Sequence, residues 1–186
     1  MHPSRSFHHC PRCGNPIHPP VGGAPMSCEG CRFRLYFNPA VAVAVFIQRA
    51  DGRILLIRRA KEPGAGLLAP PGGFIDIGER AEDAVHREVL EEVGLRITGL
   101  RFLCSQPNEY HYGGVIYPVL DLFFTATATE TQAACDPEEV RAIEWHAAQE
   151  LQGEGLAFSS MRAAWQEWIG TNPAFATDGP RDSLAR

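Results

Sequence analysis

The stretch GGFIDIGERAEDAVHREVLEEVGL, residues 72–95, gathers acidic side chains in one loop and one helix. Its apolar residues recur every four positions, at Ala81, Val85, Val89 and Val93. This spacing predicts an amphipathic helix over about 80–93, and Gly94 supplies a natural C-terminal stop. Gly72 and Gly73 precede the helix, and because they lack side chains they let the backbone approach a ligand closely.

Three carboxylates share one face of this helix. Glu88, Glu91 and Glu92 are three and four positions apart, and at about 100° per residue they fall within an arc of about 100°. Like charges on adjacent turns cost roughly a few tenths of a kcal/mol per pair, so a purely structural helix gains nothing from them. A divalent cation such as Mg²⁺ or Mn²⁺ reverses the sign, because both ions prefer oxygen ligands. A solvated acidic face is the alternative.

Four cysteines near the N-terminus form two C-x-x-C pairs separated by 14 residues: Cys10, Cys13, Cys28 and Cys31. Two tight turns that each supply a pair of thiolates suit tetrahedral Zn²⁺, and Gly14 and Gly30 offer the bends. Residues 1–37 contain few aliphatic side chains, so a structural zinc ribbon would supply stability that burial cannot. Two local disulfides or a redox pair are the alternatives.

The remainder of the chain mixes strands and helices without a βαβαβ rhythm, which predicts a mixed sheet with flanking helices. The predicted strands are 40–48, 53–60, 95–105, 115–129 and 142–148, with the first two forming a hairpin. A short amphipathic helix is predicted over 159–169, followed by a flexible tail, 171–186. The Gly/Pro-rich segment 61–73 is predicted to lack regular structure.

Composition excludes several classes of protein. The chain has 186 residues, of which 45% are hydrophobic, and this suits one medium domain with a small appendage. A net charge of -5 argues against a general binder of nucleic acid or acidic membranes. No apolar run approaches the roughly 18 residues of a membrane span, and the N-terminus lacks the apolar stretch of a secretory signal. We therefore expect a cytoplasmic protein.

The acidic stretch resembles a known family motif. From Gly73 it passes through five residues to Glu79, and through seven more to REVLEEVGL, residues 87–95. This resembles the Nudix box, G-x5-E-x7-R-E-U-x-E-E-x-G-U with U aliphatic, and every specified position is filled. The resemblance implies a Nudix α/β/α sandwich over 38–170, following a zinc ribbon over 1–37. It also implies hydrolysis of a nucleoside diphosphate linked to another moiety.

The resemblance further implies roles for residues of the box. The metal-binding glutamates of the family correspond to Glu88, Glu91 and Glu92. The carbonyl of Gly73 is a further candidate ligand for Mg²⁺ or Mn²⁺. Glu79 and Arg87 correspond to the pair that braces the motif, and Arg87 can orient a carboxylate by charge-assisted hydrogen bonds.

The base that activates water varies within this family between a glutamate of the box and a carboxylate on a later loop. Here the segment CDPEEV supplies Glu138 and Glu139 as the candidates on such a loop. A glutamate in this position would accept the proton as water attacks phosphorus. An acidic turn before a strand is the alternative interpretation of the pair.

A four-cysteine ribbon joined to a Nudix box resembles the NADH pyrophosphatase branch of the family. That branch carries an SQPWPFP-type motif after its box, and here SQPNEYHY, residues 105–112, takes its place. Gln106 becomes a candidate for substrate binding, and Tyr110 and Tyr112 can stack on a nicotinamide, adenine or flavin ring, with strand packing as the alternative. NADH, FAD, ADP-ribose, a capped RNA end and a small damaged nucleotide are candidate substrates. The same resemblance suggests a homodimer.

A binding protein is the competing class. A zinc ribbon can grip nucleic acid, and the ribbon region carries Arg5, Arg12, Arg32 and Arg34 against a single acidic residue, Glu29. Such a chain would be a nucleotide-sensing or RNA-binding regulator. The filled box argues against it, because a sensor has no need for every metal carboxylate, and four arginines with little aromatic interleaving form a weak patch.

Overall fold

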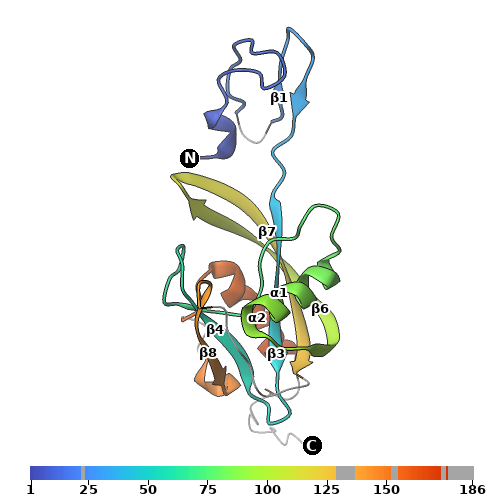
Figure 1. Cartoon of the computed structure of the whole chain (residues 1–186), viewed down its shortest axis with the longest axis vertical. Helices are drawn as coiled ribbons and strands as arrows, with labels where there is room; N and C mark the ends of the chain where they lie inside the picture. Colours follow the sequence, from blue (N-terminus) through green and yellow to red (C-terminus); the bar gives the residue numbers. More distant parts are fainter. Residues whose placement is uncertain (22–23, 129–136, 152–154, 173–174, 176–186) are drawn as a thin grey trace, which may run out of the picture.

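The computed structural model describes residues 1–21, 24–128, 137–151, 155–172 and 175 (Figure 1). Its main body is a six-stranded sheet in the order β5-β4-β3-β7-β6, and β8 pairs with β4 beside this path. The strands are β3 (Ala40–Gln48), β4 (Ile54–Arg59), β5 (Leu68–Ala69), β6 (Ile97–Tyr112), β7 (Val115–Ala128) and β8 (Val140–His146). β3 and β7 are parallel, whereas the other pairs are antiparallel, so the predicted mixed sheet is confirmed.

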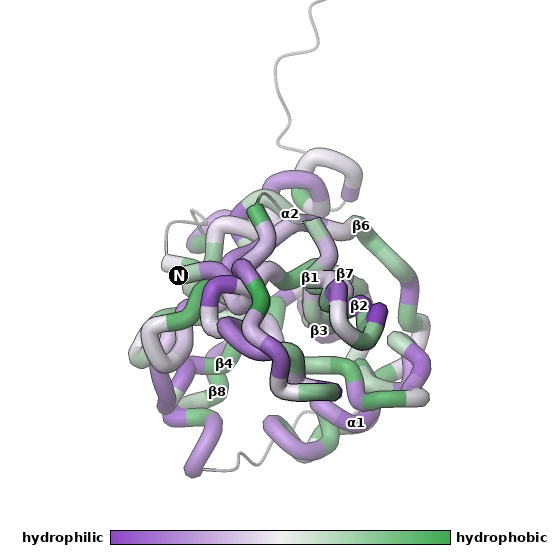
Figure 2. Tube along the Cα trace, turned by 90° about the horizontal axis from the view of Figure 1, so that it is seen from above, coloured by the Kyte–Doolittle hydropathy of each residue, from purple (hydrophilic) through white to green (hydrophobic). Residues whose placement is uncertain are grey.

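The central strand is buried on both faces. Residues 43–47 of β3 are all buried, and since alternate side chains of a strand point to opposite faces, both faces of the sheet must be covered. The helices α1 (Ala81–Val93) and α2 (Ser159–Thr171) lie on opposite sides of β3 and β7 (Figure 2). Phe46 of β3 stacks on Trp168 of α2 with ring centroids 5.1 Å apart. This arrangement is the α/β/α sandwich that the sequence predicts.

The hairpin of β6 and β7 is longer than predicted. The expected strand ended at Ser105, whereas β6 continues to Tyr112. Gly113 and Gly114 form the turn, and both have positive φ, as the favoured two-residue hairpin turns require. In the sequence, Pro107 argues against a strand that continues past Ser105, because prolines are rare inside sheets. β6 is, however, an edge strand, where proline is tolerated.

The prediction that 61–73 lacks regular structure is wrong at one point. Leu68 and Ala69 form β5, which pairs with β4 in the register Ile57↔Ala69. Both residues of β5 are buried, yet a two-residue strand between glycines and prolines is too short to produce a periodic signal. This pairing fixes the middle of the segment on the sheet and leads the chain back to the loop before α1.

The N-terminal lobe is joined to β3 by an extended segment (Figure 1). It contains the short helix η1 (Pro3–Ser6) and an antiparallel pair, β1 (Met26–Ser27) and β2 (Arg34–Leu35). The lobe touches the tip of the long hairpin, where the N–H of Ile116 donates to the carbonyl of Met1 at 2.9 Å.

The two cysteine turns have the same backbone geometry. The carbonyl of Cys10 accepts from the N–H of Gly14, and the carbonyl of Cys28 accepts from the N–H of Arg32, each at 2.9 Å. Gly14 and Arg32 both have positive φ, of 76° and 61°. Gly30 lies within the second turn, as expected, but the residue with left-handed backbone there is Arg32. A Cβ at Gly30 would lie 2.2 Å from the side-chain Nδ2 of Asn15, so that side chain would have to move.

Within the described residues, none of the helices has the length and apolar character needed to span a bilayer. α2 extends to Thr171, the first residue of the predicted tail. Most of 171–186 lies outside the described residues, so the flexible tail stays a prediction.

Candidate active site

The loop before α1 is held against the central strand. The N–H of Val43 donates to the carbonyl of Gly73 at 2.8 Å, and the N–H of Ile75 donates to the carbonyl of Val41 at 3.0 Å. Gly72 is required in this loop because a Cβ there would lie 2.0 Å from the carbonyl oxygen of Val43. The absence of a side chain therefore lets the loop reach β3 and fixes the direction of the Gly72 N–H.

Glu92 lies under this loop and is only 7% exposed. Its Oε2 accepts a hydrogen bond of 2.8 Å from the N–H of Gly72. Burial raises the pKa of Glu92 to about 8, and the nearby charges of Glu88 and Glu139 act in the same direction. A carboxylate in this position needs a cation if it is to stay ionised at neutral pH.

The other two glutamates of the face differ in exposure. The side chain of Glu88 is 12% exposed, and burial raises its pKa. Its carboxylate lies against Gly73, where a Cβ would be 2.5 Å from Oε1. Glu91 is 57% exposed and lies at the rim. Along the predicted acidic face, the exposure of the carboxylates therefore increases from Glu92, which is buried, through Glu88 to Glu91, which is solvated.

Arg87 joins three carboxylates through one guanidinium group. It binds both oxygens of Glu79, from Nε at 2.8 Å and from Nη2 at 2.9 Å. Nη1 donates to Glu88 at 2.7 Å and to Glu91 at 3.1 Å, and Nη2 also donates to the carbonyl of Phe74 at 3.0 Å. The bond from Arg87, followed by one from the N–H of Asp76, lowers the pKa of Glu79 to about 2. These bonds tie the loop to the helix.

A pocket of about 540 Å³ opens over these carboxylates, a size suited to a nucleotide-like ligand. Nine of the predicted site residues line it: Gly72, Gly73, Arg87, Glu88, Glu91, Glu92, Tyr110, Tyr112 and Glu139. Glu79 reaches the pocket only through Arg87. Gln106 and Glu138 are absent from the lining, although Glu138 is the sequence neighbour of Glu139, which contributes to it.

The carboxylates fit a divalent cation in charge and in chemistry. Buried Glu92 and Glu88 face like charges, which an ion with oxygen ligands would neutralise. The described residues contain one group of potential ligands whose donor atoms all lie within 4.8 Å, and it is the four cysteines, so the glutamate oxygens are more widely spaced. Mg²⁺ commonly retains waters and takes phosphate oxygens, so it does not need an all-protein cage. The Gly73 carbonyl already accepts from Val43, which leaves it one lone pair.

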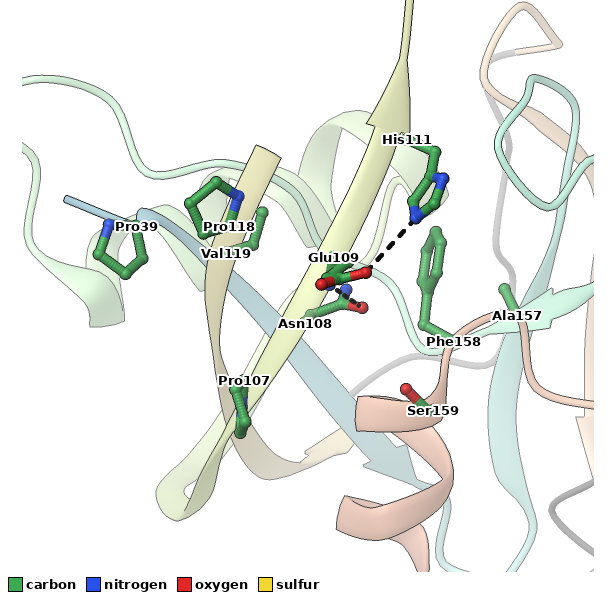
Figure 3. Close-up of a pocket in the computed structure, with 10 residues that line it drawn as sticks. All are labelled: Pro39, Pro107, Asn108, Glu109, His111, Pro118, Val119, Ala157, Phe158 and Ser159. Carbon is green, nitrogen blue, oxygen red and sulfur yellow. Dashed lines mark hydrogen bonds and ion pairs between the residues drawn. The ribbon is translucent and has the colours of Figure 1, made fainter. Parts of the chain in front are cut away.

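A second, mostly apolar compartment of about 70 Å³ adjoins the carboxylates. It shares five residues with the first pocket: Arg59, Gly72, Gly73, Phe74 and Tyr110. Asn108, Asp121 and Phe158 line its far side. Beyond Asn108 and Phe158 a third pocket opens between β6 and the start of α2 (Figure 3).

The residues that sequence reasoning missed lie mainly where these compartments meet. Arg59 lines both, and its guanidinium carbon lies 5.3 Å from the ring centroid of Phe158. Lys61 also lines the pocket over the carboxylates. The available signal for the cations is their position at the end of a predicted strand, within it for Arg59 and directly after it for Lys61, and for Asp121 it is a single carboxylate inside the apolar run VLDLFF. Phe158 carries no comparable signal, because it precedes a helix far along the chain.

The four cysteines lie together in the N-terminal lobe. The sulfur atoms of Cys10 and Cys31 are 3.6 Å apart, and so are those of Cys13 and Cys28. A disulfide needs about 2.05 Å, whereas a tetrahedral ion with bonds of about 2.3 Å separates its sulfur ligands by about 3.8 Å. All four are free thiols, so the arrangement fits a bound metal and not the disulfide alternative.

An α/β/α sandwich with a braced acidic helix beside a pocket of about 540 Å³ has the features expected of a Nudix domain. A family model of the NUDIX domain matches residues 38–165, and the chain belongs to this family. This is the family that the filled box predicts. NAD-capped RNA hydrolase NudC of Salmonella heidelberg (strain SL476) is 34% identical over 142 residues, which are 76% of this chain and 52% of that protein. The chain thus spans about half the length of the curated relatives it matches.

Solved structures agree on the fold. A MutT NUDIX hydrolase from Burkholderia pseudomallei is 31% identical with a TM-score of 0.60, covering 70% of this chain and 98% of that one. A NUDIX hydrolase from Nitrosomonas europaea is 21% identical with a TM-score of 0.65, covering 91% and 97%. The NUDIX domain of Shewanella oneidensis NrtR, complexed with ADP ribose, is 22% identical with a TM-score of 0.58, covering 69% and 86%. The last two likenesses concern the fold alone.

Proposed function

We propose that the chain hydrolyses the diphosphate of a nucleotide joined to a second group, with Mg²⁺ or Mn²⁺ as cofactor. One observation carries the proposal: a nucleotide-sized pocket combines the three box glutamates with the cations Arg59 and Lys61 and opens into an apolar compartment. Carboxylates can hold metal ions, cations can neutralise phosphate oxygens, and an apolar compartment can receive the edge of a base.

Residues of the chain have distinct tasks in this proposal. Glu88, Glu91 and Glu92 would hold the ion, which when bound polarises the phosphate oxygens and lowers the pKa of a coordinated water. Arg87 and Glu79 keep the carboxylates in position through the bonds described above. Arg59 and Lys61 face the pocket from the other side and would bind the remaining phosphate charge.

Glu139 is the favoured base among the loop candidates. It lines the pocket, and its charge helps to raise the pKa of Glu92, whereas Glu138 is not among the residues of the lining. Its side chain is 54% exposed, so it can exchange a proton with solvent. In this role it takes the proton of the attacking water.

The substrate class follows from the two compartments. A diphosphate over the carboxylates places one attached group beside the apolar compartment, which at about 70 Å³ admits only the edge of that group, so NADH, FAD, ADP-ribose and a capped RNA end are the candidates. A relative that shares the family supports this range, since it is named a NAD-capped RNA hydrolase. A homodimer and a cytoplasmic location remain predictions, the first testable by sedimentation and the second by fractionation.

The decisive experiment is a substrate panel. The purified chain is incubated with each dinucleotide, with ADP-ribose and with a NAD-capped RNA, using Mg²⁺ or Mn²⁺, and the products are identified by mass. We expect release of two monophosphates from at least one substrate and none in excess chelator. Binding of a capped RNA in a gel shift, without turnover of any substrate, would instead favour the regulator.

We also propose that the four cysteines bind a structural zinc ion. Replacing Cys13 with serine is expected to remove zinc from the purified chain and to expose residues 1–37 to proteolysis, because a metal-stapled lobe has little core of its own. Glu29→Gln, between two of the cysteines, is the matched control and should keep full zinc content. One zinc per chain in the Cys13 variant, with unchanged melting, would contradict the assignment.

A further inference from the structure

The compartment beside the carboxylates contains a carboxylate of its own. Asp121 lies on β7 in the middle of the apolar run VLDLFF and lines this compartment. It is only 6% exposed. Phe74 and Tyr110 form one aromatic wall, with ring centroids 5.6 Å apart, and Phe158 adds a third ring 6.3 Å from Tyr110. The compartment therefore joins flat apolar surfaces to one buried acid.

The partners of Asp121 hold it in place without neutralising it. The hydroxyl of Ser160, on α2, donates to Oδ2 at 2.6 Å, and the side-chain amide of Asn108 lies near the carboxylate and favours its charged form. Asn108 is itself oriented, because its Oδ1 accepts from the N–H of Glu109 at 2.9 Å (Figure 3). Within the described part of the chain, Ser160 and Asn108 are the polar partners of Asp121, and both are neutral.

A hydrogen bond that only joins β7 to α2 would not require an acid at position 121. Burying a carboxylate without a cation is costly, and burial raises the pKa of Asp121 accordingly. An asparagine would accept the Ser160 hydrogen bond equally well and would carry no charge. A carboxylate has about four acceptor positions, and Ser160 and Asn108 occupy two, so acceptor capacity is left for a ligand. Strained or costly polar groups of this kind cluster at functional sites.

The chemistry of the compartment selects its ligand. The compartment, of about 70 Å³, is smaller than a whole base, but it can admit the exocyclic N–H groups at the edge of a planar ring, and these can donate to the remaining lone pairs of Asp121. We propose that Asp121 is a specificity-determining residue that recognises the amino or amide edge of a heteroaromatic base. This inference deepens the proposed function and rests on it, because the base would be the group attached to the diphosphate over the carboxylates.

Two parts of a dinucleotide offer this chemistry, the carboxamide of nicotinamide and the amino edge of adenine. Titration calorimetry with Mg²⁺ present distinguishes these two groups. It measures the binding of three hydrolysis products, which are AMP, nicotinamide mononucleotide and ribose 5-phosphate. Asp121→Asn should weaken binding of the preferred base-bearing product by about tenfold, the usual difference between charged and neutral hydrogen bonds, and should not affect ribose 5-phosphate. Loss confined to AMP identifies adenine, and loss confined to nicotinamide mononucleotide identifies nicotinamide.

Ser160→Ala is the matched control. It removes the hydrogen bond between β7 and α2 but keeps the carboxylate, so it should lower the melting temperature and leave base binding within about twofold. Equal affinity of wild type and Asp121→Asn for both base-bearing products would overturn the inference, as would a loss in Ser160→Ala equal to that in Asp121→Asn. Base binding that depends on Asp121 in a chain that hydrolyses nothing would overturn the proposed function instead.

Discussion

Replacing Glu92 with glutamine is expected to lower kcat at least about a hundredfold while leaving the fold intact. Glu92 is the most buried carboxylate of the site, and the N–H of Gly72 already fixes one of its oxygens. Glutamine keeps an acceptor for that N–H but cannot neutralise a cation. The variant should therefore lose metal-dependent turnover and retain substrate-sized space in the pocket.

The melting temperature distinguishes this effect from misfolding. Because burial raises the pKa of Glu92 to about 8, an uncharged side chain should be tolerated there, and without divalent ions the variant should melt no lower than wild type. Glu82→Gln, at an exposed position in the first turn of the same helix, is the control and should keep wild-type kcat. Near-normal turnover in Glu92→Gln would remove the metal assignment.

The spacing of the acidic stretch predicts the helix and its brace because both are local. In a helix, Arg87 must lie next to Glu88 and one turn before Glu91, so the hydrogen-bond network follows from the sequence. The contact between Glu92 and Gly72 spans 20 positions, yet the box fixes it too, since the loop between them has a set length. Resemblance to the box therefore predicts most of the residues of the carboxylate site.

The rest of the site depends on contacts that spacing does not encode. Arg59 reaches the pocket only because β4 lies beside β3, and Phe158 only because α2 packs against β6. The motif SQPNEYHY makes Gln106 a candidate for substrate binding, but this residue does not contribute to the lining of the pocket over the carboxylates. The same limit applies to the second cysteine turn, which contains Gly30 as expected but has its left-handed residue at Arg32, a position that the sequence does not indicate.

Asp121 shows how a local irregularity can be more informative than a pattern. The run VLDLFF predicts a buried strand, and β7 confirms it, but the acid within the run breaks the apolar rule. Which face it occupies depends on its pairing with Gln106 across the sheet and with Ala42 on the parallel side. Only the assembled sheet reveals that this residue lines a compartment beside the carboxylates.

Gly72→Ala is expected to destabilise the chain by about 3 kcal/mol, because a new Cβ would lie 2.0 Å from the carbonyl oxygen of Val43 and 2.7 Å from the Cα of Ala44. These atoms belong to the central strand and cannot move without breaking the sheet. Relief would require the loop to lift away from β3, which would break the hydrogen bond from Gly72 to Glu92. Turnover should therefore fall together with stability.

Gly78→Ala separates backbone strain from this clash. Gly78 lies in the same loop with a positive φ of 85°, but no atom lies within 4 Å of the position its Cβ would take. Strain alone should cost about 1 kcal/mol there, which for a domain of this size is roughly 2–4 °C in melting temperature, against roughly 6–12 °C for Gly72→Ala. Thermal unfolding of both variants measures the difference. If the two melted together, the loop would not be pinned to β3 as the hydrogen bonds indicate, and the position of the Gly72 N–H could not be what orients Glu92.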